Sequence, residues 1–335
     1  MFDTFRNRLE IEGKLTTITA LRISKGRSTE PIGSDLPVIK DALGKPLIPG
    51  SSFKGALRSR LESFLRGIVG TDRKLVANPA NQDEWSLTAK EISNLKQLDF
   101  DQLITFLQAE EQENLLNLEF DELKKQLENL RKNISEQEFD ALKNEQKNYD
   151  SAYTTIIEQQ TDLISHLFGS PWVASKFQVR DLTVIPDTWF GQYQERDGVS
   201  IDRDTETAAD GKLYDFQVVP AGTQFQFKTV VENAEEWELG LLMVGLHQFE
   251  TEQIPLGGGI SRGLGVVKLE IDQMQWVKPE NPQQLRDYIK NLVENQLEDY
   301  QITQDRQLEL KQKWTKSFIN QLTQYLPTSS ETSTV

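Results

Sequence analysis

The 335-residue sequence contains no cysteine and only two histidines, His166 and His247. The absence of cysteine excludes disulfides, thiol catalysis and cysteine-type zinc sites. With two histidines, a histidine-rich metal site or a Ser-His-Asp relay has few residues to draw on. Any hydrolytic chemistry would therefore depend on carboxylates, backbone groups or the substrate itself.

Long apolar runs are also lacking. No stretch approaches 18 uninterrupted apolar residues, and the first residues, MFDTFRNRLEIEG, show no signal-like apolar run. We therefore expect a soluble, cytoplasmic protein with no membrane partner. The length and apolar content allow one large domain or two ordinary ones.

Positive charge is scarce over most of the chain, whose net charge is −15. Residues 1–70 are the exception, with a net charge of +5, while residues 71–165, 166–274 and 275–335 carry −10, −9 and −1. A basic block within an acidic chain allows an anionic partner at one place.

The apolar periodicity predicts six core elements in the order β, α, β, β, α, β. The segments are LEIEGKLTTITALRIS, a helix over about 53–66, FQVRDLTVIPD, GTQFQFKTVVE, EEWELGLLMVGLHQFE and VVKLEID. This order is that of the ferredoxin-like fold shared by RNA-recognition domains. We therefore predict an α+β protein with a ferredoxin-like, RRM-like core formed by residues 1–70 and 166–274.

The remaining segments differ from this core in composition. Residues 71–165 are rich in Leu, Glu, Gln and Lys, which predicts a large helical insertion of two to four helices with an acidic solvent face. Loops accept such additions at small entropic cost. We expect a C-terminal helical extension over 275–327 and a disordered tail over 328–335.

The predicted first helix has an apolar stripe and carries four basic residues on an acidic chain. The stripe, expected to face the core, consists of Phe53, Leu57, Leu61, Phe64 and Leu65. Ser51 and Ser52 are candidate N-caps, while Lys54 and Arg58 lie four residues apart and so on one side of the helix. A helix N-terminus presents unpaired N–H groups and partial positive charge, so this start suits a phosphate. An ordinary capped surface helix is the alternative interpretation.

A second glycine-rich element, Gly257–Gly265, has five glycines and one arginine in nine residues. Such a loop lets the backbone approach a ligand and form an anion nest, for which Gly258, Gly259, Ser261 and Arg262 are the candidates. It matches neither the Walker A nor the dinucleotide-binding pattern. A tight turn from helix to strand is the alternative.

Asp35 lies in the turn-like run IGSDLP, whose composition is explained by turn chemistry alone. A functional aspartate here would position a divalent cation or a ribose 2′-hydroxyl during RNA cleavage. Further acidic residues follow between 195 and 215, without the spacing of a known metal loop: Asp197, Asp202, Asp204, Glu206 and Asp210. We interpret that stretch as a solvated excursion, and the metal ligands stay unassigned.

Three runs in this order resemble the RAMP superfamily, in particular the repeated backbone subunit of type III CRISPR–Cas effector complexes. They are IGSDLPVIKDALGKPLIPGSSFKGALRSRLE, SHLFGS and PLGGGISRGLGVVKLE. The resemblance implies a core that polymerises along a guide RNA in an antiviral ribonucleoprotein complex. The partners would be guide RNA, single-stranded target RNA, other RAMP subunits and the large polymerase/cyclase-like subunit.

The resemblance also implies roles for particular residues. The Ser51-Ser52-x-Lys54 start and the Gly257–Gly265 loop would hold guide phosphates, with Arg58 and Arg262 adding charge. Asp35 aligns with the aspartate needed for cleavage of target RNA by 2′-hydroxyl attack, aided by Mg²⁺ or Mn²⁺. The stretch 195–215 would correspond to the thumb that splays bases.

Two departures from the family pattern stand out. Many relatives have a histidine near the end of the first strand where this chain has Arg22, which bears on any general-base contribution from that position. The 71–165 insertion is not typical of the plain backbone subunit and suggests a specialised position in a variant complex. Its helices would dock on a neighbouring subunit or form a solvated decoration.

Three functional hypotheses follow. The chain is a metal-dependent endoribonuclease subunit with Asp35 essential, a structural subunit that binds guide RNA without cutting, or a monomeric guide-processing nuclease that acts without metal. The third would need a general acid and base near neutral pH. No histidine lies near either glycine-rich element in the sequence.

Overall fold

The structure is a computed structural model that describes residues 4–24, 26, 35–198 and 214–326. The chain folds into two compact units. Phe64–Ser175 form the first, here called the helical unit, and Phe2–Ser63 with Lys176–Thr328 form the second, the sheet unit. The boundaries predicted from composition stay a prediction, as does the tail over 328–335, which lies outside the described residues.

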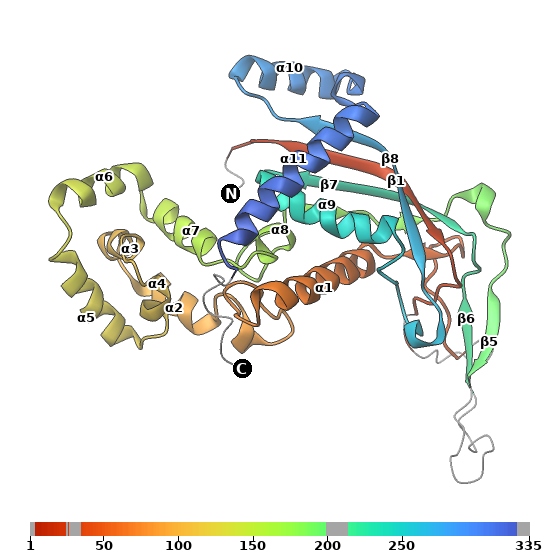
Figure 1. Cartoon of the computed structure of the whole chain (residues 1–335), viewed down its shortest axis with the longest axis horizontal. Helices are drawn as coiled ribbons and strands as arrows, with labels where there is room; N and C mark the ends of the chain where they lie inside the picture. Colours follow the sequence, from red (N-terminus) through yellow and green to blue (C-terminus); the bar gives the residue numbers. More distant parts are fainter. Residues whose placement is uncertain (1–3, 25, 27–34, 199–213, 327–335) are drawn as a thin grey trace, which may run out of the picture. The chain divides into compact units, whose positions relative to one another are not determined.

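The described residues form strands and helices in mixed order, so the α+β class is confirmed (Figure 1). The strands are β1 (Arg8–Thr17), β2 (Leu47–Ile48), β3 (Phe177–Val179), β4 (Leu182–Thr183), β5 (Gln194–Gly198), β6 (Tyr214–Val218), β7 (Gln224–Glu232) and β8 (Val267–Val277). The helices of the sheet unit are α9 (Glu236–Glu250), α10 (Pro282–Val293), α11 (Gln304–Thr323) and most of α1 (Gly50–Val69). Those of the helical unit are α2 (Ala89–Gln97), α3 (Phe100–Leu107), α4 (Gln112–Leu116), α5 (Phe120–Arg131), α6 (Glu136–Gln146), α7 (Tyr149–Gln159) and α8 (Ser165–Phe168).

The sheet unit is built on an antiparallel sheet with strand order β3-β7-β1-β8. Alternate residues of β1 are buried, as period-2 patterning requires. A register shift between Glu12 and Gly13 interrupts the β1–β8 pairing, and a Cβ at Gly13 would stand 2.1 Å from the Glu270 carbonyl oxygen. Glycine is therefore needed at position 13, where the backbone of β8 lies too close to β1 for a Cβ atom.

Helices α1 and α9 pack on each other and against this sheet. The ring of Phe53 in α1 stacks on that of Phe249 in α9, with centroids 4.5 Å apart, and contacts Phe227 of β7 at 5.0 Å. Leu57 and Leu61 press against Gly245, where a Cβ would lie 2.6 Å from a Leu57 methyl group. The apolar stripe predicted for the first helix thus forms part of the core.

The C-terminal helices of the sheet unit extend this core. A Cβ at Gly240 of α9 would lie 2.1 Å from the Trp314 carbonyl oxygen, so α9 and α11 are in close backbone contact. Trp314 is fully buried and meets Trp276 of β8 edge to face. Helix α10 is anchored by Tyr288, whose ring stacks on Phe5.

The helical unit holds more helices than composition predicted. Between residues 71 and 165, all of which are described, there are six α-helices where two to four were expected. The reason is local: Thr88, Asp99, Ser135 and Asn148 each accept a backbone N–H and begin a new helix. The unit has its own core of buried residues, among them Leu95, Leu103, Ile104, Phe106, Leu123, Leu127 and Ile156.

Candidate nucleic-acid interface

The start of α1 differs from the sequence prediction. The helix begins at Gly50, so Ser51 and Ser52 lie in its first turn and the prediction that they cap it is wrong. Asp181 accepts the Gly50 N–H at 2.8 Å, and the Pro49 carbonyl accepts the Ser52 N–H at 2.9 Å. Internal acceptors therefore already satisfy part of the N-terminal turn, although the Ser51 side chain is exposed.

Lys54 and Arg58 lie on one side of α1, as predicted, and both are partly buried. The Lys54 ammonium donates to the Phe177 carbonyl at 3.2 Å, and the Arg58 Nε donates to Glu62 Oε1 at 2.7 Å. Burial lowers the pKa of Lys54, and the neighbouring charge of Arg58 lowers it further. An anion placed near both cations would relieve this cost of holding two positive charges together.

The two other basic residues of α1 contact acceptors of the protein. Arg60 Nε donates to Gln248 Oε1 at 2.6 Å, and Arg66 donates to the Ala77 carbonyl at 2.8 Å. These residues therefore tie the helix to its surroundings. Of the four cations, the pair formed by Lys54 and Arg58 is the one adjoining the helix start.

The Gly257–Gly265 loop packs tightly on the chain segment that follows β1. The Gly258 N–H donates to the Arg22 carbonyl at 2.8 Å, and the Gly265 N–H donates to the Ala20 carbonyl at 2.9 Å. Gly257 has φ +78°, and a Cβ there would stand 2.1 Å from the Arg22 oxygen. The glycines at 257 and 265 are thus required by backbone packing, which favours the tight-turn interpretation for those two positions.

The middle of this loop is more open. Gly259 and Gly263 adopt left-handed conformations on either side of a short 3-10 turn, Ile260–Arg262. Ser261 and Arg262 are exposed, and nothing lies within 4 Å of a Cβ built at Gly258. The loop therefore presents Gly258, Ser261 and Arg262 at the surface.

Strand β6 contributes aromatic side chains beside the loop that the sequence analysis did not single out. Arg262 donates to the Tyr214 hydroxyl at 2.9 Å, a contact that lowers the pKa of Tyr214. Arg22 lies over the ring of Phe216, 4.6 Å from its centroid. Phe216 is only 5% exposed, so the accessible part of this region is Arg262 with Tyr214, a planar cation and an aromatic ring of the kind on which nucleobases stack.

Asp35 lies against the ribbon formed by β5 and β6. Its Oδ2 accepts the Asp215 N–H at 3.4 Å, and the Leu36 N–H donates to the Asp215 carbonyl at 3.1 Å. Partial desolvation raises the pKa of the Asp215 carboxyl. The hydrogen bond and the negative charge of Asp197 raise it further, as does the negative charge of Asp35. The acidic residues Asp202, Asp204, Glu206 and Asp210 lie outside the described residues.

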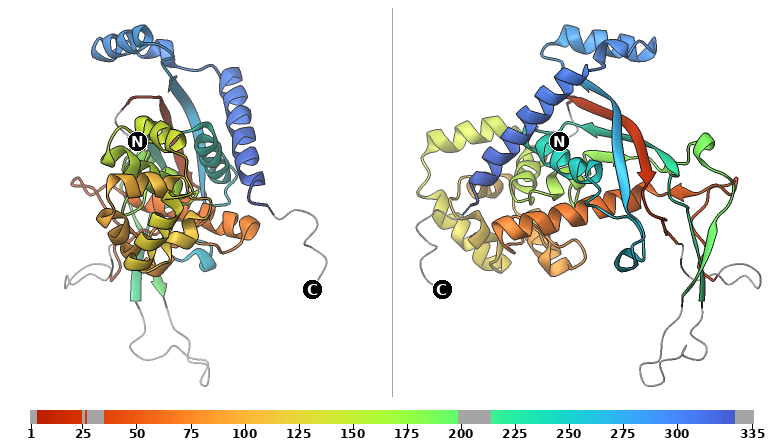
Figure 2. Two further views of the ribbon diagram at one scale, coloured as in Figure 1. Left: turned by 90° about the vertical axis from the view of Figure 1, so that its left-hand side faces the viewer. Right: turned by 45° about the vertical axis from the view of Figure 1, so that its right-hand side comes forward.

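A ladder of backbone hydrogen bonds connects the two predicted phosphate-binding elements. Beyond the Gly258 contact to Arg22, the Ile39 N–H donates to the Ile23 carbonyl, and the Leu47 N–H donates to Ile39. Leu47 pairs in turn with Thr183 of β4. Since neighbouring strands lie about 4.8 Å apart, the glycine loop and the start of α1 lie a few strand widths from each other, without direct contact. Both occur at the same end of the sheet unit, which also carries β5 and β6 (Figures 1 and 2).

Cations, an open glycine loop and an aromatic side chain at one end of an α+β core are typical of RNA-binding proteins. Comparison with known sequences agrees with that class. The profile of the RAMP superfamily matches residues 14–268, so the chain belongs to the RAMP superfamily.

Three curated relatives share shorter regions with this chain, and each is named "CRISPR system Cms endoribonuclease Csm3". The protein of Enterococcus italicus is 41% identical over 66 residues, 19% of this chain and 31% of the relative. That of Mycobacterium tuberculosis is 37% identical over 78 residues, 23% and 31% of the two chains. That of Methanocaldococcus jannaschii is 43% identical over 60 residues, 18% and 24%. The chain thus matches about a quarter to a third of the length of these relatives.

Within the described ranges, no helix combines the length and the apolar character that spanning a bilayer requires.

Proposed function

We propose that this protein is a subunit of a type III CRISPR–Cas effector complex that binds guide RNA and cleaves complementary target RNA. The family and the named relatives support the class of complex. The observation that carries the proposal is the position of the Lys54–Arg58 pair and the Gly257–Gly265 loop at one end of the sheet unit, joined by the backbone ladder.

We also propose that the core is ferredoxin-like. The described elements follow the order β1, α1, β3, β7, α9, β8, with the short strands β2, β4, β5 and β6 between them. The sheet order β3-β7-β1-β8 is antiparallel throughout. Both features agree with a split βαβ arrangement whose sheet is covered by α1 and α9.

In the proposed mechanism, the guide phosphates would lie along the two cationic elements. Lys54 and Arg58 would supply charge at α1, while the Gly259 N–H and the hydroxyls of Ser51, Ser52 and Ser261 would hydrogen-bond phosphate oxygens. Gly258, whose N–H is held by the Arg22 carbonyl, would let the strand approach the backbone closely. Arg262 and Tyr214 would face bases or riboses next to the β5–β6 ribbon, which would act as the thumb, while the buried ring of Phe216 would hold Arg22 in place.

Cleavage is assigned to Asp35. A divalent cation fits this position, because Mg²⁺ is commonly held by one or two carboxylates together with substrate phosphates. Asp35 and Asp215 provide two neighbouring carboxylates, and their mutual repulsion would fall on cation binding. The cation, Mg²⁺ or Mn²⁺, would stabilise charge on the cleaved phosphate. Asp35 would orient the target strand so that the ribose 2′-hydroxyl faces the adjacent phosphate.

One observation favours the structural-subunit alternative. Across the described part of the chain, no group of three or more His, Asp or Glu residues could hold a metal ion by itself. A cation held at Asp35 by described residues alone would thus need further ligands, which the phosphates of RNA would supply. The third hypothesis has less support, since His247 lies on α9 with its ring hydrogen-bonded to Glu250 and His166 belongs to the helical unit.

The test is target cleavage by the assembled complex carrying Asp35→Ala, with Asp187→Ala as a control that removes another exposed carboxylate of the sheet unit. We expect Asp35→Ala to abolish one metal-dependent cut and leave guide binding intact, whereas Asp187→Ala changes neither. An unchanged cleavage ladder would favour the structural subunit. Cleavage of precursor RNA by the isolated chain in EDTA would instead support the guide-processing nuclease.

A further inference from the structure

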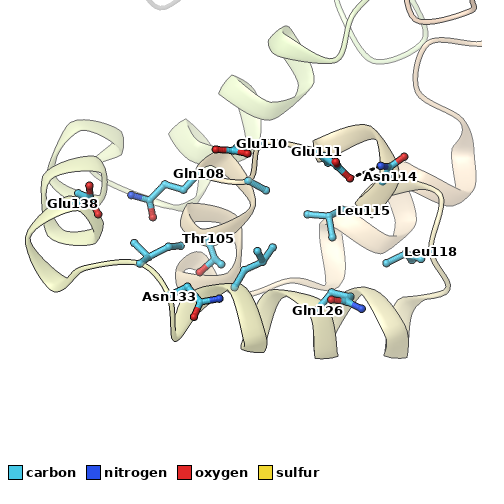
Figure 3. Close-up of a pocket in the computed structure, with 13 residues that line it drawn as sticks. Thr105, Gln108, Glu110, Glu111, Asn114, Leu115, Leu118, Gln126, Asn133 and Glu138 are labelled. Carbon is cyan, nitrogen blue, oxygen red and sulfur yellow. Dashed lines mark hydrogen bonds between the residues drawn. The ribbon is translucent and has the colours of Figure 1, made fainter.

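The helical unit contains a pocket of about 890 Å³, bounded by the end of α3, by α4 and by α5 with the turn into α6 (Figure 3). This volume lies within the range of small-ligand sites. Its apolar lining comes from Leu115, Leu118, Leu130 and Ile134. All of these residues belong to one compact unit, so the pocket does not depend on the RNA-binding region.

One polar atom of this pocket lacks a partner. The Oε1 atom of Gln108 is buried and accepts no hydrogen bond among the described residues. In Figure 3 the Gln108 side chain points toward Glu138. A buried carbonyl oxygen without a donor is unfavourable, so a ligand donor that reaches it through a small rotation of the Gln108 side chain would gain a hydrogen bond that the described residues do not supply.

The charged residues that line the pocket are all acidic: Glu110, Glu111 and Glu138, with no lysine or arginine among the lining residues. Hydrogen bonds from the side chain and backbone of Ser135 lower the pKa of Glu138, which favours its ionised form. Glu111 accepts from Asn114 Nδ2 at 2.6 Å, which orients its carboxylate at the rim. These charges favour cations and disfavour phosphates.

A second hollow of about 510 Å³ adjoins this pocket. Its lining shares Glu110, Glu111 and Asn114 with the first. The two adjacent glutamates therefore form an acidic ridge between two cavities. A flexible ligand with more than one positive charge that extends over this ridge would meet Lys74 as well as Glu113 in the second hollow, so its attraction there would be weaker than in the first pocket.

We propose that this pocket binds an aliphatic cation, namely an ammonium or guanidinium group at the end of an alkyl chain. Such a group has several N–H donors and no acceptor, which matches the Gln108 carbonyl and the three carboxylates. The alkyl part would lie along the leucine and isoleucine side chains, as the stems of Lys and Arg do on apolar surfaces. The ligand that carries this cationic group would be either a basic side chain of another polypeptide or a free polyamine.

The experiment is calorimetric titration of the full-length chain with two probes, spermidine and the peptide acetyl-leucyl-arginyl-leucine amide. The matched neutral ligand is the same peptide with citrulline in place of arginine. We expect saturable binding of at least one cationic probe, weakened by added salt because the rim is exposed. Tighter binding of the peptide identifies a polypeptide source, and tighter binding of spermidine identifies a polyamine.

Variants connect that binding to the pocket. Glu110→Gln combined with Glu111→Gln, and separately Gln108→Leu, should each weaken binding by about tenfold, since each removes acceptors for the cation. The control is Glu122→Gln combined with Glu128→Gln, an equal change in charge on exposed positions of α5 outside the pocket. Absence of binding by both cationic probes, binding of the citrulline peptide equal to that of the arginine peptide, or equal affinity in all variants would overturn the proposal.

Discussion

Lys176 and Glu238 form an ion pair that is almost removed from solvent in the sheet unit. The Lys176 Nζ lies 2.6 Å from Glu238 Oε1 and 2.7 Å from Oε2, and the exposed fractions of the two residues are 5% and 0%. The Glu235 N–H donates to the same carboxylate at 2.7 Å. Burial raises the pKa of Glu238 to about 7, while the charge and hydrogen bonds of Lys176 oppose this shift.

Removing one partner of this pair should be costly. We expect Glu238→Leu to lower the free energy of unfolding by about 3–5 kcal/mol, because the buried ammonium of Lys176 is then left with neither a counter-charge nor the hydrogen-bond acceptor that even a protonated carboxyl supplies. The double variant Lys176→Met with Glu238→Leu should recover most of that loss, since both charges are gone. Urea denaturation of the three proteins measures this. A single variant as stable as the original protein would contradict the expectation.

The same pair predicts a pH dependence of stability. The folded pKa of Glu238 lies above its ordinary value of 4.5, so the folded state binds this proton more tightly than the unfolded state. Its contribution is therefore fully present below about pH 4.5 and is lost as the pH rises toward 7. We expect the stability of the original protein, minus that of the double variant, to decrease over this window in denaturation series at several pH values. A flat or rising difference would show that Glu238 is not shifted upward.

At the scale of single elements, α1 shows what its sequence could and could not predict. The stripe of Phe53, Leu57, Leu61 and Leu65 is fully buried, because its four-residue spacing follows one face of the helix. Phe64, expected in that stripe, is 37% exposed, since it lies one step round the helix from Leu65. Local periodicity therefore predicted the core face well.

The polar contacts of α1 and of the glycine loop could not be predicted in this way. The acceptor for the first N–H of α1 is Asp181, which is 131 residues away in the chain, so Ser51 and Ser52 were mistaken for caps. Arg262 meets Tyr214 across 48 residues. Such pairings depend on how the sheet brings distant segments together. For the contact of Arg262 with Tyr214, the local sequence signal is the alternation of aromatic residues in YDFQV.

The N-terminal half of α1 yields a prediction for RNA binding. We expect Lys54→Ala combined with Arg58→Ala to weaken guide RNA binding uniformly across sequences and to reduce the slope of log K against log salt by about 1.4 for two lost phosphate contacts. Filter binding at several salt concentrations measures both quantities. Lys290→Ala combined with Arg306→Ala, which removes two exposed cations of α10 and α11, is the matched control.

Because Glu62 is nearly buried beside Arg58, the pair of substitutions in α1 could also disturb the fold. A third variant that adds Glu62→Gln removes this uncompensated charge and separates stability from binding. Loss that depends on RNA sequence, or an unchanged salt slope in both α1 variants, would show that these cations do not contact phosphates.

At the scale of the whole molecule, the chain combines two units with separate cores. One cluster of buried leucines and other apolar residues in the helical unit is drawn entirely from residues between 87 and 173. The proposed RNA-binding residues all belong to the sheet unit, and the cation pocket lies in the helical unit. The two proposed binding activities therefore rest on different cores and should respond to different mutations.

This separation predicts which parts of the chain a core mutation affects. Leu103 in α3 and Leu9 in β1 are both fully buried, so replacing either with alanine should cost about 2–5 kcal/mol. In peptide-resolved hydrogen exchange of the full chain, we expect Leu103→Ala to lower protection in residues 87–173 while β1, β7 and β8 keep theirs. Leu9→Ala should do the reverse and should also weaken guide RNA binding, which Leu103→Ala leaves unchanged. If either substitution lowers protection throughout the chain, the two units unfold as one, and the division into independent cores is wrong.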